Sequence, residues 1–350
     1  MLLFLIRLFS AICAYIFLAK ANIYFTTLEH FVFVGGYRSL LLFSPFIVFL
    51  FKSKSSFIIF LISAICSEAI LLVSNPSFHF LSIAMLSLGL SSGGYLIKQQ
   101  AAETAQKASF NKLALCFGSI ISGLIISTAV DNQPFFIHIC SFLLFLSACL
   151  SFILSKKNIK GNENIKKRPP SLFLKILFLS VGISIGIRVF GLFVIFPQYL
   201  LTIYDKLPTW YGVEMTFYAT LVILSQLPAA FKIKQFSFEI ALFALFISCL
   251  ILAFPSIFFV QFLTGALFWS SLLAIEEVFA PFIDKEASKY NCLLYKEIGM
   301  GVGAGISVLI MRQIHSPLVV GGIGAAFTLG AFLSIKYSFN KKSGLLYQPE

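Results

Sequence analysis

Charged residues are scarce in this sequence. Only 11% of its 350 residues are Asp, Glu, Lys or Arg, and the acidic residues number 14. Soluble domains carry about 25% charged and about 45–50% apolar residues. This chain is 59% hydrophobic, contains 42 Phe and has a mean hydropathy of +0.95. The composition excludes a soluble domain, a disordered chain and a disulfide-stabilised scaffold, and it is typical of a protein that crosses a membrane many times.

The residue patterns that enzymes and metal proteins need are also missing. The seven cysteines form no CxxC pair and no Cys/His zinc spacing, so we interpret them as small buried side chains. No Ser/His/Asp order, HExxH motif or pair of carboxylates indicates a catalytic set. We therefore expect no cofactor, no bound metal and no enzymatic activity. A polytopic membrane enzyme is the alternative from another class.

Apolar segments long enough to span a bilayer, about 20 residues each, recur along the chain between turn residues such as Asn75-Pro76 and Ser316-Pro317. They predict an all-α integral membrane protein with twelve transmembrane helices in two pseudo-symmetric six-helix halves. The predicted helices cover residues 8–28, 31–51, 56–74, 78–97, 111–130, 134–155, 172–200, 210–231, 236–254, 256–280, 293–312 and 317–337. Glycines are concentrated in several of these spans, where small residues allow close helix packing.

Lysine and arginine gather on one side of this arrangement. With a cytoplasmic N-terminus, 21 of the 26 cations fall on the cytoplasmic side, two on the outer side and three within spans. Cytoplasmic loops of membrane proteins carry such an excess of positive charge. The bias predicts a multi-pass protein of the cytoplasmic (inner) membrane with both termini in the cytoplasm. A cleavable signal peptide ending at Ala19-Lys20-Ala21 is the alternative for the N-terminus.

Two six-helix halves joined by a basic cytoplasmic loop resemble the major facilitator superfamily of transporters. On this resemblance, residues 1–155 form the N-terminal half, residues 156–171 a basic cytoplasmic linker, and residues 172–350 the C-terminal half with a short cytoplasmic tail. The loop at 51–56, FKSKSS, keeps the positive charge of the family's usual motif there and lacks the rest of it. The resemblance implies a secondary transporter that works by alternating access. A ten-helix drug/metabolite transporter fits the length but not a basic loop after the sixth span.

Three cations lie inside predicted spans, where a charge costs at least about 2.5–3.5 kcal/mol. They are Lys20, Arg38 and Arg188. Lys20 follows Arg7 by 13 residues, and Arg188 follows Lys175 by the same number. If the halves are repeats, Lys20 and Arg188 are equivalent and face each other across a central path, with Arg38 nearby. Because these side chains bind carboxylates and phosphates, we predict that the three bind an anionic substrate. Snorkelling of Lys20 to the outer interface is the alternative.

Acidic residues suggest two further roles. Glu68, inside the third predicted span, is a candidate for proton coupling because burial favours the protonated carboxyl; a structural ion pair with Arg38 is the alternative. Other acids and lysines gather at the cytoplasmic ends of the tenth and eleventh spans. The candidates there for a cytoplasmic gate are Glu276, Glu277, Lys296 and Glu297. A solvated charged loop is the alternative for this cluster.

The sequence therefore predicts a transporter of a small, anionic organic solute. The alternative cargo is an amphipathic drug or siderophore held by aromatic side chains. We expect the small-molecule substrate and the lipid bilayer as partners, no nucleic acid, and a monomeric protein. All four histidines map to the predicted outer side, which leaves a contact with a metal or siderophore iron as a further alternative. They are His30, His79, His138 and His315.

Overall fold

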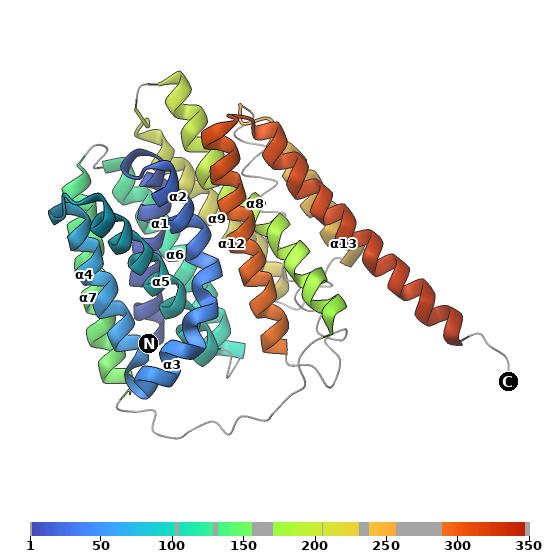
Figure 1. Ribbon diagram of the computed structural model, residues 1–350, viewed down its shortest axis with the longest axis horizontal. Coiled ribbons are helices and arrows are strands. Elements are labelled where there is room, and N and C mark those ends of the chain that lie inside the picture. The colour runs from blue at the N-terminus through green and yellow to red at the C-terminus, as the bar shows by residue number, and fades with distance from the viewer. Residues whose placement is uncertain are drawn as a thin grey trace.

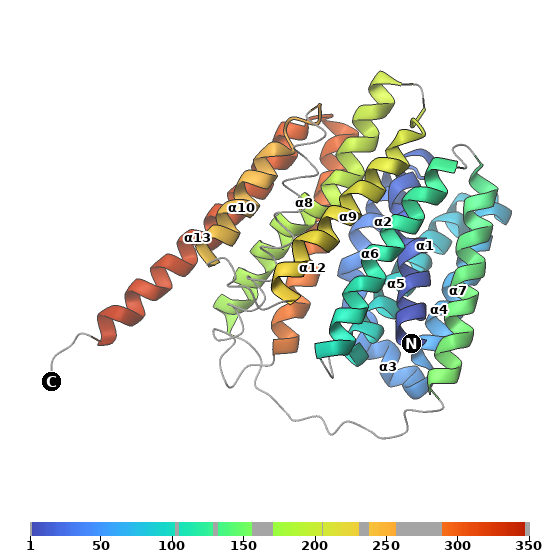
Figure 2. The same ribbon diagram turned by 180° about the vertical axis from the view of Figure 1, so that it is seen from behind.

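The computed structural model describes residues 2–101, 105–128, 132–155, 171–204, 206–230, 238–256 and 289–346. These residues form long helices and contain no strand (Figures 1 and 2). In a bilayer this follows from the backbone, because a helix satisfies its own N–H and C=O groups where no water is present. The predicted all-α class is confirmed. The predicted helix at 256–280 and nearly all of the linker lie outside the described residues.

The helices of the first half, here called the N-terminal half, run from the N-terminus to residue 155. They are α1 (Leu2–Tyr24), α2 (Thr27–Ser39), the 3₁₀ turn η1 (Leu40–Phe43), α3 (Ser44–Phe51), the 3₁₀ turn η2 (Lys52–Lys54), α4 (Ser55–Leu72), α5 (Pro76–Ala101), α6 (Ala105–Thr128) and α7 (Gln133–Ser155). The described helices of the C-terminal half are α8 (Leu172–Ile203), α9 (Trp210–Ala230), α10 (Phe238–Ile251), α12 (Lys289–Gln313) and α13 (Pro317–Leu346).

The second span differs from the single helix predicted at 31–51. The α-helix ends at Ser39, passes through the turn η1 and restarts as α3. Pro45 lies in the first turn of α3. A proline has no N–H for the preceding turn, and its ring collides with the carbonyl four residues earlier. The break at 39–44 is therefore a local consequence of one residue, and average hydropathy does not detect it.

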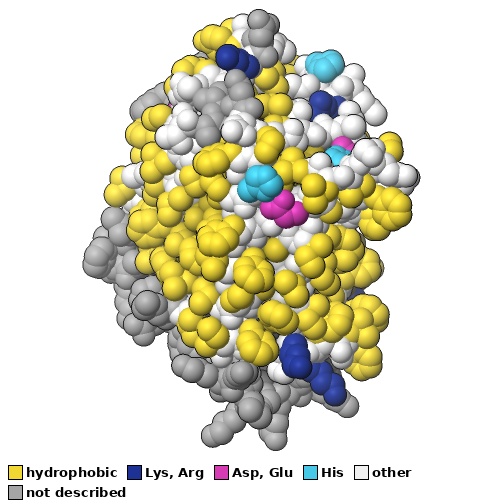
Figure 3. Space-filling view, turned by 90° about the vertical axis from the view of Figure 1, so that its left-hand side faces the viewer, with side chains coloured by type: hydrophobic (Ala, Val, Ile, Leu, Met, Phe, Trp, Pro, Cys, Tyr) yellow, Lys and Arg dark blue, Asp and Glu magenta, His cyan; other side chains and the backbone are white. Residues whose placement is uncertain are grey.

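Seven helical segments of the described residues are long and apolar enough to cross a membrane, counting Thr27–Leu72 as one segment. Shorter apolar helices cover Leu113–Thr128 and Leu242–Ile251. The outer surface is apolar as well: Figure 3 shows one face covered largely by hydrophobic side chains. Large exposed apolar patches are rare on soluble monomers, so this face is the one expected to contact lipid.

Helix contacts follow the same scheme in both halves. The first helix of each half packs against the last one: α1 contacts α7, and α8 contacts α13. The pairs α4 with α7 and α10 with α13 are likewise equivalent. Two helix pairs make extensive contacts between the halves, α2 with α12 and α6 with α9, and α1 also contacts α8. These inter-half contacts bring together residues far apart in the sequence, and they frame the candidate site.

Candidate functional site

Helices α2 and α12 approach each other through glycine. A methyl group added at Gly35 would lie 3.3 Å from both the Gly301 carbonyl oxygen and the Gly305 Cα. A methyl group at Gly301 would collide with the backbone of Gly35 and Ser39. Small residues let two helix backbones come this close, so the predicted close packing of the glycine-rich span is confirmed at these positions. The close approach places the polar residues on the two helices within bonding range.

An ion pair joins the halves beside this contact. Arg38 Nη1 lies 3.0 Å from Glu297 Oε2, with side chains only 19% and 9% exposed. The Arg38 guanidinium also lies 5.0 Å from the ring centre of Tyr37 and 5.7 Å from that of Phe190. The pair couples α2 to α12 in a largely desolvated position, where charges interact strongly. The alternative pairing of Arg38 with Glu68 is therefore wrong.

A second guanidinium lies close to this pair. Arg7 on α1 is buried, and its guanidinium occupies the space where a Gly94 side chain would be, on α5. Arg38, Glu297, Tyr37 and Tyr15 all interact with it electrostatically. The cluster thus holds two guanidiniums and one carboxylate, which leaves one net positive charge. Sequence reasoning assigned Arg7 to the cytoplasmic mouth and missed this role.

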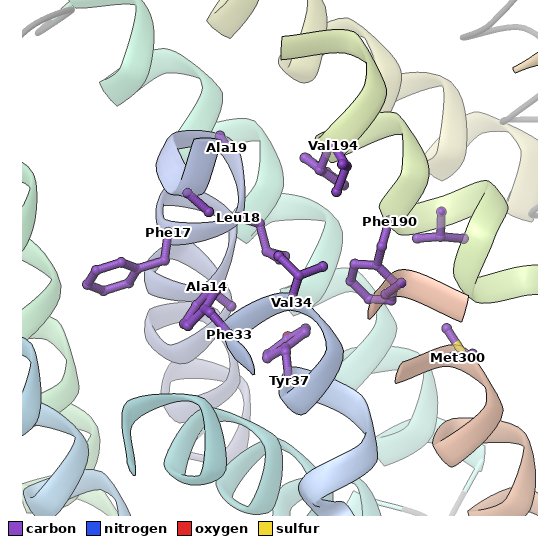
Figure 4. Close-up of a cluster of buried hydrophobic side chains, with 14 of the residues drawn as sticks. Ala14, Phe17, Leu18, Ala19, Phe33, Val34, Tyr37, Phe190, Val194 and Met300 are labelled. Atoms are coloured by element: carbon purple, nitrogen blue, oxygen red, sulfur yellow. The ribbon is translucent and has the colours of Figure 1, made fainter. Parts of the chain in front are cut away.

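Aromatic side chains surround the cluster from both halves. Tyr37 and Phe190 pack edge to face with ring centres 5.9 Å apart, and Tyr15 and Phe193 lie 5.8 Å apart. Figure 4 shows Tyr37 on α2, Phe190 on α8 and Met300 on α12 directed toward one another. The ion pair is therefore enclosed by a largely apolar wall with aromatic faces. A pocket with apolar walls and few polar groups is typical of small-molecule sites.

Among the described residues, Lys20 and Arg188 are the two largest fully buried side chains, each 1% exposed. Lys20 Nζ lies 5.1 Å from the ring centre of Phe136 on α7, inside the N-terminal half. Arg188 interacts electrostatically with Tyr218 and Cys249, both in the C-terminal half. Both cations are buried, and the predicted arrangement, in which they face each other between the halves and bind substrate, stays a prediction.

One end of the inter-half interface is closed by polar contacts. Arg312 Nη2 donates to the carbonyl oxygens of Asn22 at 2.8 Å and Phe25 at 3.3 Å, which binds α12 to the end of α1. Asn22 Nδ2 in turn lies 3.2 Å from the Val194 carbonyl oxygen of α8. At the same end, Thr216 of α9 donates to the Ile120 carbonyl of α6 at 3.2 Å. We call Arg312 and Asn22 the α1–α12 clasp.

The other candidate acids are distributed as follows. Glu68 faces away from the cluster, with its carboxylate 3.0 Å from His138 Nδ1 and the two side chains 34% and 62% exposed. Lys296 is buried on α12 next to Glu297. Glu276 and Glu277 lie outside the described residues. Among the described residues, no group of three His, Cys, Asp or Glu side chains could hold a metal ion.

Neither a family model nor a curated protein matches this sequence, but solved structures match the fold. The POT family transporter PepTSo superposes with a TM-score of 0.71 at 13% identity, over 96% of this chain and 98% of that chain. A peptide transporter POT in complex with sulfate gives 0.71 at 11% identity, over 96% and 94%. A D-xylose-proton symporter gives 0.63 at 10% identity, over 94% and 95%.

These identities establish the fold and no more. The structures matched over nearly their whole length are transporters with the fold of the major facilitator superfamily. The predicted fold, that of the major facilitator superfamily, is therefore confirmed. The prediction of a multi-pass membrane protein is confirmed as well. Which molecule this chain binds is a separate question, which its own side chains must answer.

Proposed function

We propose that this chain is a secondary active transporter that moves a small organic anion by alternating access. The observation that carries the proposal is the cluster of buried Arg7 and Glu297 with partly buried Arg38 at the inter-half contact. Buried charges of this kind are expensive in a membrane protein and mark substrate or ion pathways. The neighbouring structures, a peptide transporter family and a D-xylose-proton symporter, support transport as the general activity.

The charge of the cluster favours an anionic substrate. Its two guanidiniums share one carboxylate among the described residues, so a second carboxylate would balance the charge. A carboxylate or phosphate of the substrate would supply it, with hydrogen bonds in the forked geometry that arginine offers. A substrate group that takes the Arg38 Nη1 donor would loosen the bond that this nitrogen now makes to Glu297 Oε2. Substrate binding would therefore compete directly with an inter-half contact.

This competition gives a route to alternating access. The moving units would be residues 1–155 and 172–350, which repeat the same helix contacts. The clasp and the Thr216 contact hold the units together at one end. When substrate separates Arg38 from Glu297, the units can rock about the glycine contact of α2 and α12, as in other repeat-built transporters.

Glu297 is a better candidate than Glu68 for proton coupling. Its carboxylate is paired with Arg38 between the halves, whereas Glu68 contacts His138 on an exposed surface. Protonation of Glu297 would release Arg38 for the substrate. Glu297→Gln should therefore keep substrate exchange and lose accumulation driven by a pH gradient, while Glu68→Gln keeps both.

A second cargo class has support in the aromatic walls. Tyr15, Tyr37, Phe190 and Phe193 pair between the halves, and such faces suit an amphipathic drug or siderophore. A counterflow screen in proteoliposomes separates the two proposals: the loaded vesicles are offered small carboxylates and phosphates in one set and amphipathic compounds in the other. Exchange with the small anions alone supports the first proposal. Exchange with neither set contradicts both.

The orientation in the membrane follows from charge. We place both termini and residues 156–171 in the cytoplasm and the protein in the inner membrane, because 21 of 26 cations sort to that side. The clasp would then close the outer end. Reporter fusions at Lys160 and Lys342 test the orientation, and an extracytoplasmic signal at either position contradicts it.

A further inference from the structure

The short helix α3 lies almost entirely outside the helix bundle. Apart from Ser44 at its start, its side chains are exposed or half-buried, and every one of them after Ser44 is apolar. Phe49 is 76% exposed, and Phe46 and Leu50 are more than half exposed. Exposure of these apolar side chains to water would be unfavourable for an eight-residue helix. Its exposed face must lie against the hydrocarbon of the bilayer.

Two lysines end this apolar segment. Lys52 and Lys54 form the exposed turn η2 directly after Phe51. Lys52 has φ 48°, a left-handed conformation that costs energy for a residue with a side chain. The Ser55 hydroxyl holds the turn by donating to the Lys52 carbonyl at 2.5 Å. The turn therefore places two exposed lysines at the edge of an apolar surface. Figure 3 shows basic side chains at the lower edge of the hydrophobic face.

We propose that α3 and η2 form a binding site for an anionic phospholipid. The acyl chains lie against Phe46 and Phe49, and the headgroup phosphate accepts hydrogen bonds from Lys52 and Lys54. Charge complementarity decides the occupant: an apolar surface that ends in two cations matches a lipid with a negative headgroup. No acidic residue lies between Glu29 and Glu68 in the sequence, so no neighbouring carboxylate along this segment neutralises the lysines.

The proposed lipid site on α3 is joined by the backbone to the contact between α2 and α12. α3 continues α2 through η1, and α2 carries Arg38 and Gly35. A lipid seated on α3 would fix the position of the far end of α2. Because α2 moves against α12 in the proposed cycle, anionic lipid would change the transport rate. This consequence rests on the proposed function, whereas the lipid site itself does not.

Lipid binding tests the site without a transport assay. The full-length protein is titrated in detergent with phosphatidylglycerol or phosphatidylcholine, and bound lipid is counted by native mass spectrometry. The parent should prefer phosphatidylglycerol. The double variant Lys52→Gln/Lys54→Gln should bind it roughly 25-fold more weakly, at about fivefold per lysine. Lys52→Arg/Lys54→Arg keeps the charge and should retain the preference.

The matched control is Lys341→Gln/Lys342→Gln, which removes the same charge near the end of α13. It should bind phosphatidylglycerol like the parent. Equal binding by the Lys52→Gln/Lys54→Gln variant and the parent would overturn the site. So would an equal loss in the control, because net charge rather than α3 would then be responsible. A parent that does not distinguish the two lipids also contradicts the proposal.

Discussion

At the scale of single residues, Arg38 makes the most specific contacts in the cluster. It bonds to a carboxylate of the other half and lies over two aromatic rings. Arg38→Lys keeps the charge but loses the forked geometry, so apparent substrate affinity should fall about tenfold while some transport survives. Arg38→Leu should abolish uptake. Counterflow in proteoliposomes measures both variants, and full uptake by Arg38→Leu per folded molecule would remove Arg38 from the site.

For Arg188 the prediction differs, because Tyr218 and Cys249, with which it interacts electrostatically, belong to its own half. If the residue binds substrate, Arg188→Leu abolishes uptake and leaves the melting temperature unchanged. If it is structural, removing one member of a buried polar network costs about 3–5 kcal/mol. The melting temperature then falls, and the remaining folded fraction transports normally. Both quantities are measured on one preparation, and we expect the structural result.

Sequence could identify these buried cations but not their partners. Arg38 and Arg188 were visible because a charge in an apolar segment is rare and costly. Glu297 lies 259 residues from Arg38, and nothing in either local segment indicates the pairing. Arg7 was missed because it lies near the start of the first apolar segment, where a cation is ordinary. The equal spacing of Lys20 and Arg188 indicates similar depth and does not by itself identify the neighbouring helix.

At the scale of helices, the glycine contact of α2 and α12 makes a quantitative prediction. Gly301→Ala places a methyl group against the backbone of α2, and overpacking of this kind costs about 1–3 kcal/mol. Melting temperature and initial uptake rate should both fall. Gly322→Ala is the matched control, since nothing lies within 4 Å of the added methyl group. Alanine is the better helix former, so the control should be as stable as the parent or more so. Equal stability of both variants would contradict the contact.

Helix boundaries were predicted well where average hydropathy determines them and poorly where a single residue determines them. The predicted spans at 134–155 and 56–74 differ from α7 and α4 by at most two residues at either end. The span at 31–51 is interrupted at Ser39 because Pro45 prevents a continuous helix. That signal was present in the sequence, but an apolar average over about 20 residues conceals it.

At the scale of the whole molecule, the described contacts between the halves are unequal along the membrane normal. The clasp and the contacts of α6 with α9 use the last turns of α1, α6 and α12 and the first turns of α9. The Arg38–Glu297 pair lies further along α2 and α12 from that end. Hydrogen bonds between the halves therefore hold the end that carries Arg312 together.

Breaking the clasp should shift the protein toward the opposite state. Arg312→Gln removes two hydrogen bonds from a charged donor to α1, and each contributes about 1.5–3 kcal/mol. Val34, fully buried between the halves (Figure 4), serves as the reporter as Val34→Cys in an otherwise cysteine-free background. An impermeant maleimide added from outside should label this cysteine about tenfold faster or more when Arg312→Gln is present, since the loss of one such bond, at about 1.5 kcal/mol or more, already shifts the equilibrium by that factor. Lys206→Gln removes the other outer cation, which lies outside the clasp, and should leave the labelling rate at the parent value. Equal rates in all three proteins would show that the clasp does not hold this end closed.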